Sequence, residues 1–138
     1  MATNEELDYI IDAADRFYAE AGFAYPDNVR EYYESLNDNP MIFTVVEHGN
    51  GFIVGFIAPS FLEPSKMMCS ELAWYVEPEY RGTSVGIKLM KRYEQMAIDE
   101  GCDTITMVAL DSLNPESVGA IYKKLGYTTL EHHYKKEL

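Results

Sequence analysis

Residues 78–97, PEYRGTSVGIKLMKRYEQMA, place a glycine-containing turn between two strongly patterned segments. The preceding CSELAWYV has the branched and aromatic composition of a strand, and the following residues carry apolar side chains at helical spacing. At a strand–turn–helix junction, main-chain N–H groups converge and the helix dipole favours negative charge. Gly82 and Gly86 let the backbone approach a ligand closely. The junction therefore predicts a site for a small-molecule phosphate or diphosphate, with Arg81 as a fixed positive charge.

The other segments predict the order α-α-β-β-β-α-β-α-β. Thr3 to Glu6 has the form of a capping box at the start of the first helix, and HGNG at 48–51 is a hairpin signal between two strands. Helices are expected at about 4–21, 29–36, 85–100 and 115–125, and strands at 41–47, 52–58, 67–76, 104–110 and 127–134. A hairpin meander followed by strand–helix–strand indicates an α/β protein with a mixed sheet and helices on both faces.

The length and composition indicate one soluble domain. A chain of 138 residues suffices for one domain, 1–138. Its first residues lack the apolar core of a signal peptide, and no run approaches the roughly 18 apolar residues of a membrane span. Cys69 and Cys102 are expected to be buried or half-buried thiols, and no Cys/His group has zinc-ligand spacing. We therefore expect a cytoplasmic protein without a membrane association or a metal.

The formal net charge is −12, with a sequence pI near 4.5. This field repels phosphate backbones and argues against nucleic acid as a general partner. It favours cationic partners such as amines, polyamines or basic peptides. Solubility alone is an alternative reason for the charge, and mimicry of a nucleic acid is another.

Two common phosphate-binding patterns do not fit the turn. A Walker A loop needs four residues between its glycines and a following lysine, whereas Gly82 and Gly86 enclose three residues and Ile87 follows. The dinucleotide pattern G-x-G-x-x-G is also absent. The stretch YVEPEYRGTSVGIKLM resembles instead the signature [Q/R]-x-x-G-x-[G/A] of the GNAT family, the GCN5-related N-acetyltransferases, and looks most like short bacterial or phage-borne members.

Two further segments support the resemblance. ELAWYVEPEYRG is similar to the end of the family's fourth strand, and NPESVGAIYKKLGY resembles the family's region N-x-x-A-x-x-x-Y-x-x-x-G-F near the C-terminus. The resemblance covers residues 40 to 130. Ser84 stands where the family usually has glycine, which is compatible with a negative φ, and its hydroxyl can cap the following helix.

The resemblance implies acetyl transfer from acetyl-CoA to a primary amine. Main-chain amides of the turn would hold the diphosphate, and the pantetheine arm would pair with strand backbone as an added strand. An amide near Tyr75 or Val76 would polarise the thioester carbonyl, and Asn114 would bond the pantetheine amides. The implied cofactor-binding residues are Tyr75, Val76, Arg81, Gly82, Thr83, Ser84, Val85, Gly86, Asn114 and Tyr122.

Proton transfer is assigned by the same resemblance. Glu71 is the candidate base that takes the proton of the attacking amine, with Asp111 as a weaker candidate. Strand alternation, in the absence of a bulge, places Glu71 on the same face as Ala73 and Tyr75. Tyr122 matches the tyrosine that protonates the departing thiolate, although a core aromatic is the plain alternative.

Several questions remain open from the sequence. His48, at the hairpin turn, is expected to be a surface histidine, and the aromatic residues of the first two helices are expected to be core. The acidic composition suits several classes of acceptor amine, and the resemblance is compatible with a homodimer. The alternative function is a catalytically inactive acidic module on the same fold, either a nucleic-acid mimic or an acyl-CoA sensor.

Overall fold

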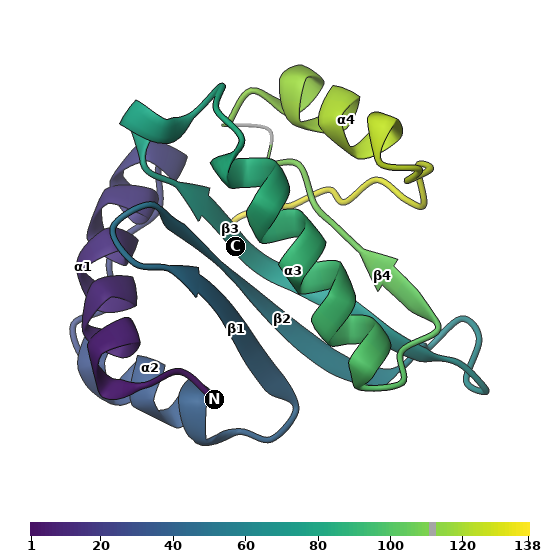
Figure 1. The fold of residues 1–138 in the computed structure, drawn as a ribbon, viewed down its shortest axis with the longest axis horizontal. Coiled ribbons are helices and arrows are strands. Elements are labelled where there is room, and N and C mark those ends of the chain that lie inside the picture. Colours follow the sequence, from purple (N-terminus) through teal and green to yellow (C-terminus); the bar gives the residue numbers. More distant parts are fainter. Residues whose placement is uncertain (111–112) are drawn as a thin grey trace. The chain divides into compact units, whose positions relative to one another are not determined.

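The centre of the fold is a four-stranded mixed sheet in the order β1-β2-β3-β4 (Figure 1). The computed structural model describes residues 1–110 and 113–138. The chain divides into two compact units, Met1–Val108 and Ala109–Leu138. The first unit holds the sheet with α1, α2 and α3, and the second holds α4.

The strands are β1 (Ile42–Glu47), β2 (Gly51–Pro59), β3 (Met67–Val76) and β4 (Thr104–Thr106). β1, β2 and β3 form an antiparallel meander, and β4 lies parallel to β3 after the crossover through α3. The mixed sheet and the first three predicted strands are confirmed. The fourth strand is shorter than predicted, because the chain leaves the sheet after Thr106.

The helices of the first unit are α1 (Asn4–Ala21), α2 (Val29–Asp38) and α3 (Val85–Asp99), with a short 3₁₀ turn, η1 (Pro78–Tyr80), before α3. The predicted capping box is present, since Thr3 and Glu6 bond each other's backbone N–H groups. Gly22 ends α1 at φ +83°, a left-handed conformation that glycine adopts without steric cost. These local signals explain why the helix boundaries follow the sequence closely.

Each face of the sheet packs against different helices. On the α1 face, α1 packs on side chains of β1, β2 and β3, in a cluster of Ala2, Tyr9, Ile10, Ala13, Val46, Phe52, Val54 and Tyr75. On the α3 face, Tyr93 stacks on Phe43 with ring centroids 5.4 Å apart. Cys69 is fully buried there and donates its S–H to the Tyr93 hydroxyl at 3.1 Å. Cys102 is half-buried, so both cysteine predictions are confirmed.

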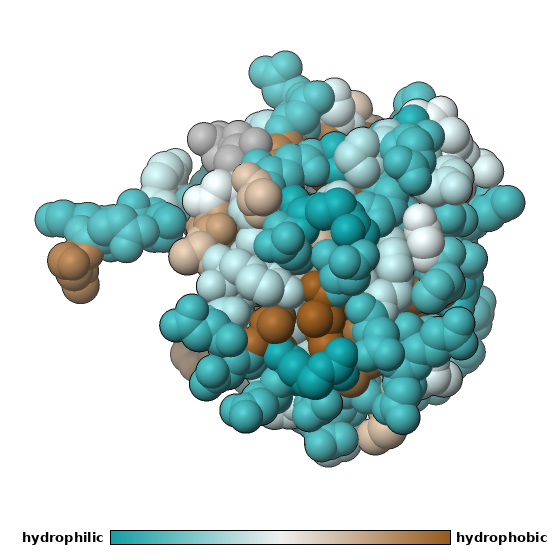
Figure 2. Space-filling model, turned by 90° about the vertical axis from the view of Figure 1, so that its left-hand side faces the viewer, coloured by the Kyte–Doolittle hydropathy of each residue, from teal (hydrophilic) through white to brown (hydrophobic). Residues whose placement is uncertain are grey.

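The outer surface of the first two helices is polar. Hydrophilic residues dominate the side of the molecule that faces the viewer in Figure 2, around a small group of hydrophobic ones. Among the residues that the structure describes, no helix is long and apolar enough to cross a membrane.

The last predicted strand, 127–134, is wrong. In the described part of the chain, no strand follows β4, and all side chains from Thr128 to Leu138 are exposed. Leu130 and Tyr134, the large apolar residues of the predicted strand's middle and end, are 58% and 92% exposed. A strand is stabilised by burying one face on a core, and this segment has no continuous apolar face to bury.

Candidate active site

β3 is paired on both sides over its first half alone. β4 pairs with Met68–Ser70, whereas β2 continues to pair as far as Val76. The N–H of Glu77 donates to the carbonyl of Asn50 at 2.8 Å. Antiparallel alternation therefore points the main-chain groups of Tyr75 toward β2, and those of its two neighbours away from β2.

The main chain of Val76 thus points to the side of β3 on which, among the described residues, no strand pairs beyond Ser70, and we call this side the open edge of β3. The carbonyl of Val76 agrees with this direction, because it accepts a hydrogen bond from Nε of Arg81 at 2.9 Å instead of one from a strand. Of the two amides suggested by the sequence, the geometry favours Val76 over Tyr75 as a donor to a ligand. An extended ligand can add to such an edge as a further strand.

A β-bulge in β3 marks the start of the open half. Gly55 pairs with Glu71 and Val54 pairs with Ala73, so Leu72 is an extra residue that has no partner on β2. Leu72 is 51% exposed. A bulge of this kind bends the strand and changes which face each following side chain occupies.

The bulge corrects the predicted faces of β3. Direct cross-strand partners share a face, and a Cβ added at Gly55 would lie 2.8 Å from the Tyr93 ring of α3. Glu71 therefore lies on the α3 face, whereas Ala73 and Tyr75 lie on the α1 face. The prediction that these three residues share one face applied to a strand without a bulge, and the bulge at Leu72 places Glu71 on the opposite face from the other two.

Glu71 is a buried carboxyl group, 7% exposed, at the point where β3 and β4 separate. Burial raises its pKa to about 8, and a hydrogen bond from the N–H of Val108 offsets part of this effect. Val108 lies two residues beyond the end of β4. A side chain therefore joins the two segments where their backbones no longer pair. A carboxyl group of this pKa can exchange a proton at mildly alkaline pH, where part of it is ionised.

The glycine turn leads from η1 into α3. Gly82 has φ +78°, which favours glycine, and Ser84 has φ −74°, which any residue adopts. The negative φ makes the serine compatible with this position, as anticipated. Ser84 makes no side-chain capping bond in the described structure. Instead, the hydroxyl of Thr83 donates to the carbonyl of Tyr80 and accepts the N–H of Val85 at 3.3 Å.

The start of α3 supplies main-chain donors beside the open edge. Its first regular hydrogen bond runs from the N–H of Lys88 to the carbonyl of Ser84 at 3.0 Å. The N–H groups of Ser84, Gly86 and Ile87 precede this ladder and point out of the helix end. A Cβ at Gly86 would lie 3.4 Å from Trp74 Cζ2, so this end of α3 directly faces the open half of β3.

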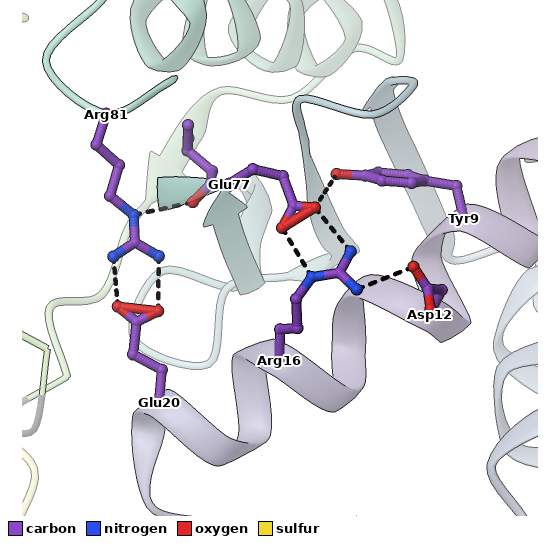
Figure 3. Close-up of polar contacts among 7 residues, drawn as sticks. Tyr9, Asp12, Arg16, Glu20, Glu77 and Arg81 are labelled. Carbon is purple, nitrogen blue, oxygen red and sulfur yellow. Dashed lines mark hydrogen bonds and ion pairs between the residues drawn. The ribbon is translucent and has the colours of Figure 1, made fainter. Parts of the chain in front are cut away.

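Arg81 is held by the protein itself (Figure 3). Both of its terminal nitrogens contact the carboxylate of Glu20 on α1, with Nη2 at 2.6 Å from Oε2. Its Nε donates to Val76, and its guanidinium carbon lies 5.5 Å from the centre of the Tyr75 ring. The predicted role of Arg81 toward a diphosphate stays a prediction, but in this structure its donors are committed to the chain.

Glu77 anchors the end of β3 to α1 (Figure 3). It is 6% exposed and accepts two hydrogen bonds from Arg16, at 2.7 and 3.0 Å, and one from the hydroxyl of Tyr9 at 3.3 Å. Burial opposes ionisation of this carboxyl group. The hydrogen bonds from Arg16, Tyr75 and Tyr9 outweigh burial and hold its pKa below the usual value. The hydroxyl of Tyr75 therefore serves this network on the α1 face.

The remaining site residues lie in the second unit, on α4 (Pro115–Lys124). Asn114 precedes the helix with φ +45°, the left-handed region that asparagine tolerates better than most residues. Tyr122 is buried, with its ring 5.8 Å from that of Tyr127. Their roles toward a cofactor and a thiolate stay predictions. Asp111, the weaker candidate base, lies outside the described residues.

Comparison with known proteins identifies the family. The Acetyltransferase (GNAT) family matches residues 7–127, which span both units. The chain belongs to the GNAT family. The resemblance of its glycine turn and of its α4 segment to GNAT enzymes is thereby confirmed at the level of the family.

Curated relatives match over a shorter segment. The chain is 42% identical over 52 residues to a thialysine N-epsilon-acetyltransferase of Sus scrofa, which is 38% of this chain and 29% of that protein. The equivalent protein of Bos taurus is 40% identical over the same length. The match therefore spans less than a third of these relatives' length.

Solved structures share the fold over nearly the whole chain. A transcriptional regulator from Bacillus halodurans C-125 has a TM-score of 0.80 at 15% identity, over 99% of this chain and 96% of that one. A predicted acetyltransferase with acetyl-CoA from Clostridium acetobutylicum has a TM-score of 0.73 at 15% identity, over 99% and 92%. At these identities the likeness establishes the GNAT-like fold.

Four residues of the site were not anticipated from the sequence: Arg16, Glu20, Trp74 and Glu77. Arg16 and Glu20 are four residues apart and so share a face of α1, but no sequence signal links that face to the end of β3. Trp74 follows from Val76 by strand alternation, once the open edge is known. Among the described residues, no three His, Cys, Asp or Glu side chains are placed to hold a metal ion.

Proposed function

We propose that this GNAT protein is an acetyl-CoA-dependent N-acetyltransferase that acts on a primary amine. The observation that carries the proposal is the open edge of β3 beside the glycine turn and the start of α3. Family membership supports acetyl transfer, and a structural neighbour was crystallised with acetyl-CoA. The name of the porcine relative specifies an amine acceptor.

The residues present fit a coenzyme of this kind. The main chain of Val76 would pair with the amide-containing arm, and the N–H groups of Ser84, Gly86 and Ile87 would hold the diphosphate. Gly86 lets the start of α3 lie close to β3, since an added Cβ would be 3.4 Å from Trp74 Cζ2. When bound, acetyl-CoA supplies an acetyl group activated as a thioester.

Glu71 is the proposed general base. A free alkylamine has a pKa of about 10.4, so most of it is protonated and not nucleophilic near neutral pH. A carboxylate within reach, directly or through one water, can take this proton. Glu71 is buried on the α3 face, beside the open half of β3, and its raised pKa suits proton exchange at mildly alkaline pH.

Tyr122 is the proposed acid that protonates the departing thiolate. Its phenol, with an ordinary pKa of about 10, can deliver a proton to a thiolate when it is held close. The support is the family pattern around AIYKKLGY and the burial of the ring. The acidic net charge of −12 supports a cationic acceptor, since it raises the local concentration of amines.

The test combines binding with turnover. Acetyl-CoA should raise the melting temperature of the protein by mass action, and a panel of amines should include at least one that releases free coenzyme thiol. Tyr122→Phe should lower this turnover by about 10²-fold or more, while Tyr134→Phe, at an exposed tyrosine of the same unit, should not. Stabilisation by acetyl-CoA without thiol release for any amine would instead indicate an acyl-CoA sensor, and no stabilisation would indicate the nucleic-acid mimic.

A further inference from the structure

Arg81 joins three parts of the first unit. Its Nε bonds the carbonyl of Val76 at the end of β3, its two terminal nitrogens grip Glu20 on α1, and its plane approaches the ring of Tyr75. Arg81 itself lies in the glycine turn, one residue after η1. One side chain therefore fixes the open edge of β3, the turn and α1 to one another (Figure 3).

These contacts leave Arg81 poorly placed to act as a ligand of a diphosphate. A guanidinium binds a phosphate or a carboxylate through a fork of two parallel N–H donors, and Glu20 holds this fork in the structure. The fork would have to release a carboxylate that raises the pKa of Arg81. The main-chain donors at the start of α3 need no such exchange.

A second guanidinium–carboxylate pair also joins α1 to the segment that runs from the end of β3 to the glycine turn, with the acid and the base exchanged. Arg16 of α1 holds Glu77 at the end of β3, whereas Glu20 of α1 holds Arg81 of the turn. Because each element contributes one acid and one base, sliding α1 by a turn would bring like charges together. The two pairs therefore specify one position of α1 against the end of β3.

We infer that Arg81 and Glu20 are positioning residues, which hold the open edge of β3 and the glycine turn in the geometry that binds the coenzyme through main-chain donors. The inference rests on the proposed function for the identity of the ligand. The contacts of Arg81 with Glu20 and Val76, which we call the clamp, do not depend on the proposed function. Arg81 therefore contributes to acetyl-CoA binding through Val76 and the turn, and not through contact with the diphosphate.

The sign of the Glu20 effect separates this role from direct binding. For a clamp, Glu20→Gln and Arg81→Gln should each weaken acetyl-CoA binding about tenfold, and the double variant should be little worse than either single one. If Arg81 were a ligand that Glu20 competes for, Glu20→Gln would tighten binding. Asp8→Asn is the control on α1: it breaks the exposed pair of Asp8 with Arg30 of α2 and should leave the affinity within twofold.

Two further readouts distinguish a clamp from a phosphate ligand. Arg81→Lys keeps the charge but loses the fork, so it should bind acetyl-CoA as weakly as Arg81→Gln. S-acetylpantetheine carries the thioester arm without the diphosphate. The Gln variants should also lose affinity for this compound, because the edge at Val76 that would bind its arm is displaced together with the turn. Unchanged affinity for this compound, with a loss confined to acetyl-CoA, would overturn the inference.

A ligand-free measurement keeps the clamp testable if the wild-type protein does not bind acetyl-CoA. Hydrogen–deuterium exchange of the variants should speed up over residues 74–86 and stay unchanged over 43–46 in β1. Unchanged exchange over 74–86 in both Gln variants would overturn the clamp. Faster exchange over 74–86 in the Gln variants, together with no binding of acetyl-CoA by the wild-type protein, would support the clamp and overturn the proposed function alone.

Discussion

The two halves of β3 differ in what surrounds them. Met67–Ser70 is paired with β2 and β4, and its centre, Cys69, is fully buried against α3. Glu71–Val76, which contains the bulge at Leu72, pairs with β2 alone among the described strands, and it begins with a buried carboxyl group. The first half is ordinary sheet core, whereas the second half pairs with one strand, β2, among the strands that the structure describes.

The comparison shows how a small sheet can open without losing its core. Leu72 interrupts the pairing of the second half with β2 by one extra residue, and the early end of β4 leaves this half without a β4 partner. Side-chain hydrogen bonds connect this half to its surroundings instead. Glu71 accepts one from the N–H of Val108 beyond β4, and Glu77 accepts one from Arg16 of α1. The open half therefore depends on buried polar groups, and the closed half depends on apolar packing.

The largest expected effect is on turnover, through Glu71 at the boundary of the two halves. Glu71→Gln keeps the size of the side chain but cannot take a proton, so it should lower kcat by about 10²- to 10⁴-fold. Initial rates of thiol release check this, with the exposed Glu79→Gln as the matched control. Wild-type turnover in the Gln variant would show that water or another group is the base.

The pH dependence of the same residue has a definite sign. Because the pKa of Glu71 is about 8 when folded and about 4.5 ordinarily, the folded state retains a proton that the unfolded chain releases between these values. Stability should fall as pH rises through this window, while the rate should increase up to about pH 8. Thermal melts and rate profiles of Glu71→Gln should lack both features.

Loss of Arg16 should have the next largest effect, on the anchoring of the open half. Arg16→Gln leaves the buried carboxylate of Glu77 without its cation and should lower the free energy of unfolding by about 3 kcal/mol, at the low end for broken buried pairs because Arg16 is half-exposed. Since the pKa of Glu77 is lowered in the fold, the loss should shrink as pH falls below about 4.5.

The control for this measurement is Arg30→Gln, by urea unfolding of both variants. Arg30 pairs with Asp8 at 2.7 Å, but both side chains are more than half exposed, so its loss should cost about 0.5 kcal/mol. Equal losses in the two variants would contradict the anchoring role of Glu77.

Alanine substitution of two glycines on β2 compares the two ends of the second half of β3. A Cβ at Gly51, opposite Val76, would lie 2.4 Å from the carbonyl oxygen of Tyr75, whereas one at Gly55, opposite Glu71, would meet side-chain ring atoms. Backbone atoms can move away from an added methyl group less easily than a side-chain ring can. Gly51→Ala should therefore lower the free energy of unfolding by about 2 kcal/mol, which is more than Gly55→Ala should. Urea unfolding of both variants ranks them, and the reverse ranking would indicate that the open half is the more compliant.

The smallest expected effect concerns the departure from the family signature. At φ −74°, Ser84 needs no glycine, so Ser84→Gly should reduce stability by about 0.5 kcal/mol through added freedom of the unfolded chain. Acetyl-CoA affinity, measured by calorimetry, should stay within about twofold. A several-fold gain would mean that the serine side chain obstructs the coenzyme.

Local signals predict most of this fold. The capping box at Thr3, the HGNG hairpin and the apolar run of β3 each act over a few residues, and the structure places them where the sequence does. The segment 127–134 has strand-forming residues but no apolar face, so composition alone misassigned it. The early end of β4 also depends on its neighbours in space, which composition does not encode.

The sequence predicts the glycine turn of the site but not the contacts that connect the site residues to the rest of the fold. The glycine turn and the start of α3 follow from residues 81–86, and the suitability of Ser84 follows from its φ. The face of Glu71 depends on a bulge at Leu72 that no residue pattern marks. The pairing of Arg81 with Glu20 joins positions 61 residues apart, and such contacts appear only once the chain is folded.

The burial of Cys69 affects how coenzyme release can be followed. Burial raises the pKa of its thiol to about 11, despite the Tyr93 hydroxyl, and burial also raises the pKa of the Cys102 thiol. Thiolates, not thiols, attack chromogenic disulfides, so near neutral pH the protein itself should react slowly with such a reagent. The colour that develops in an assay of the proposed turnover should then come from liberated coenzyme, with little background from the protein.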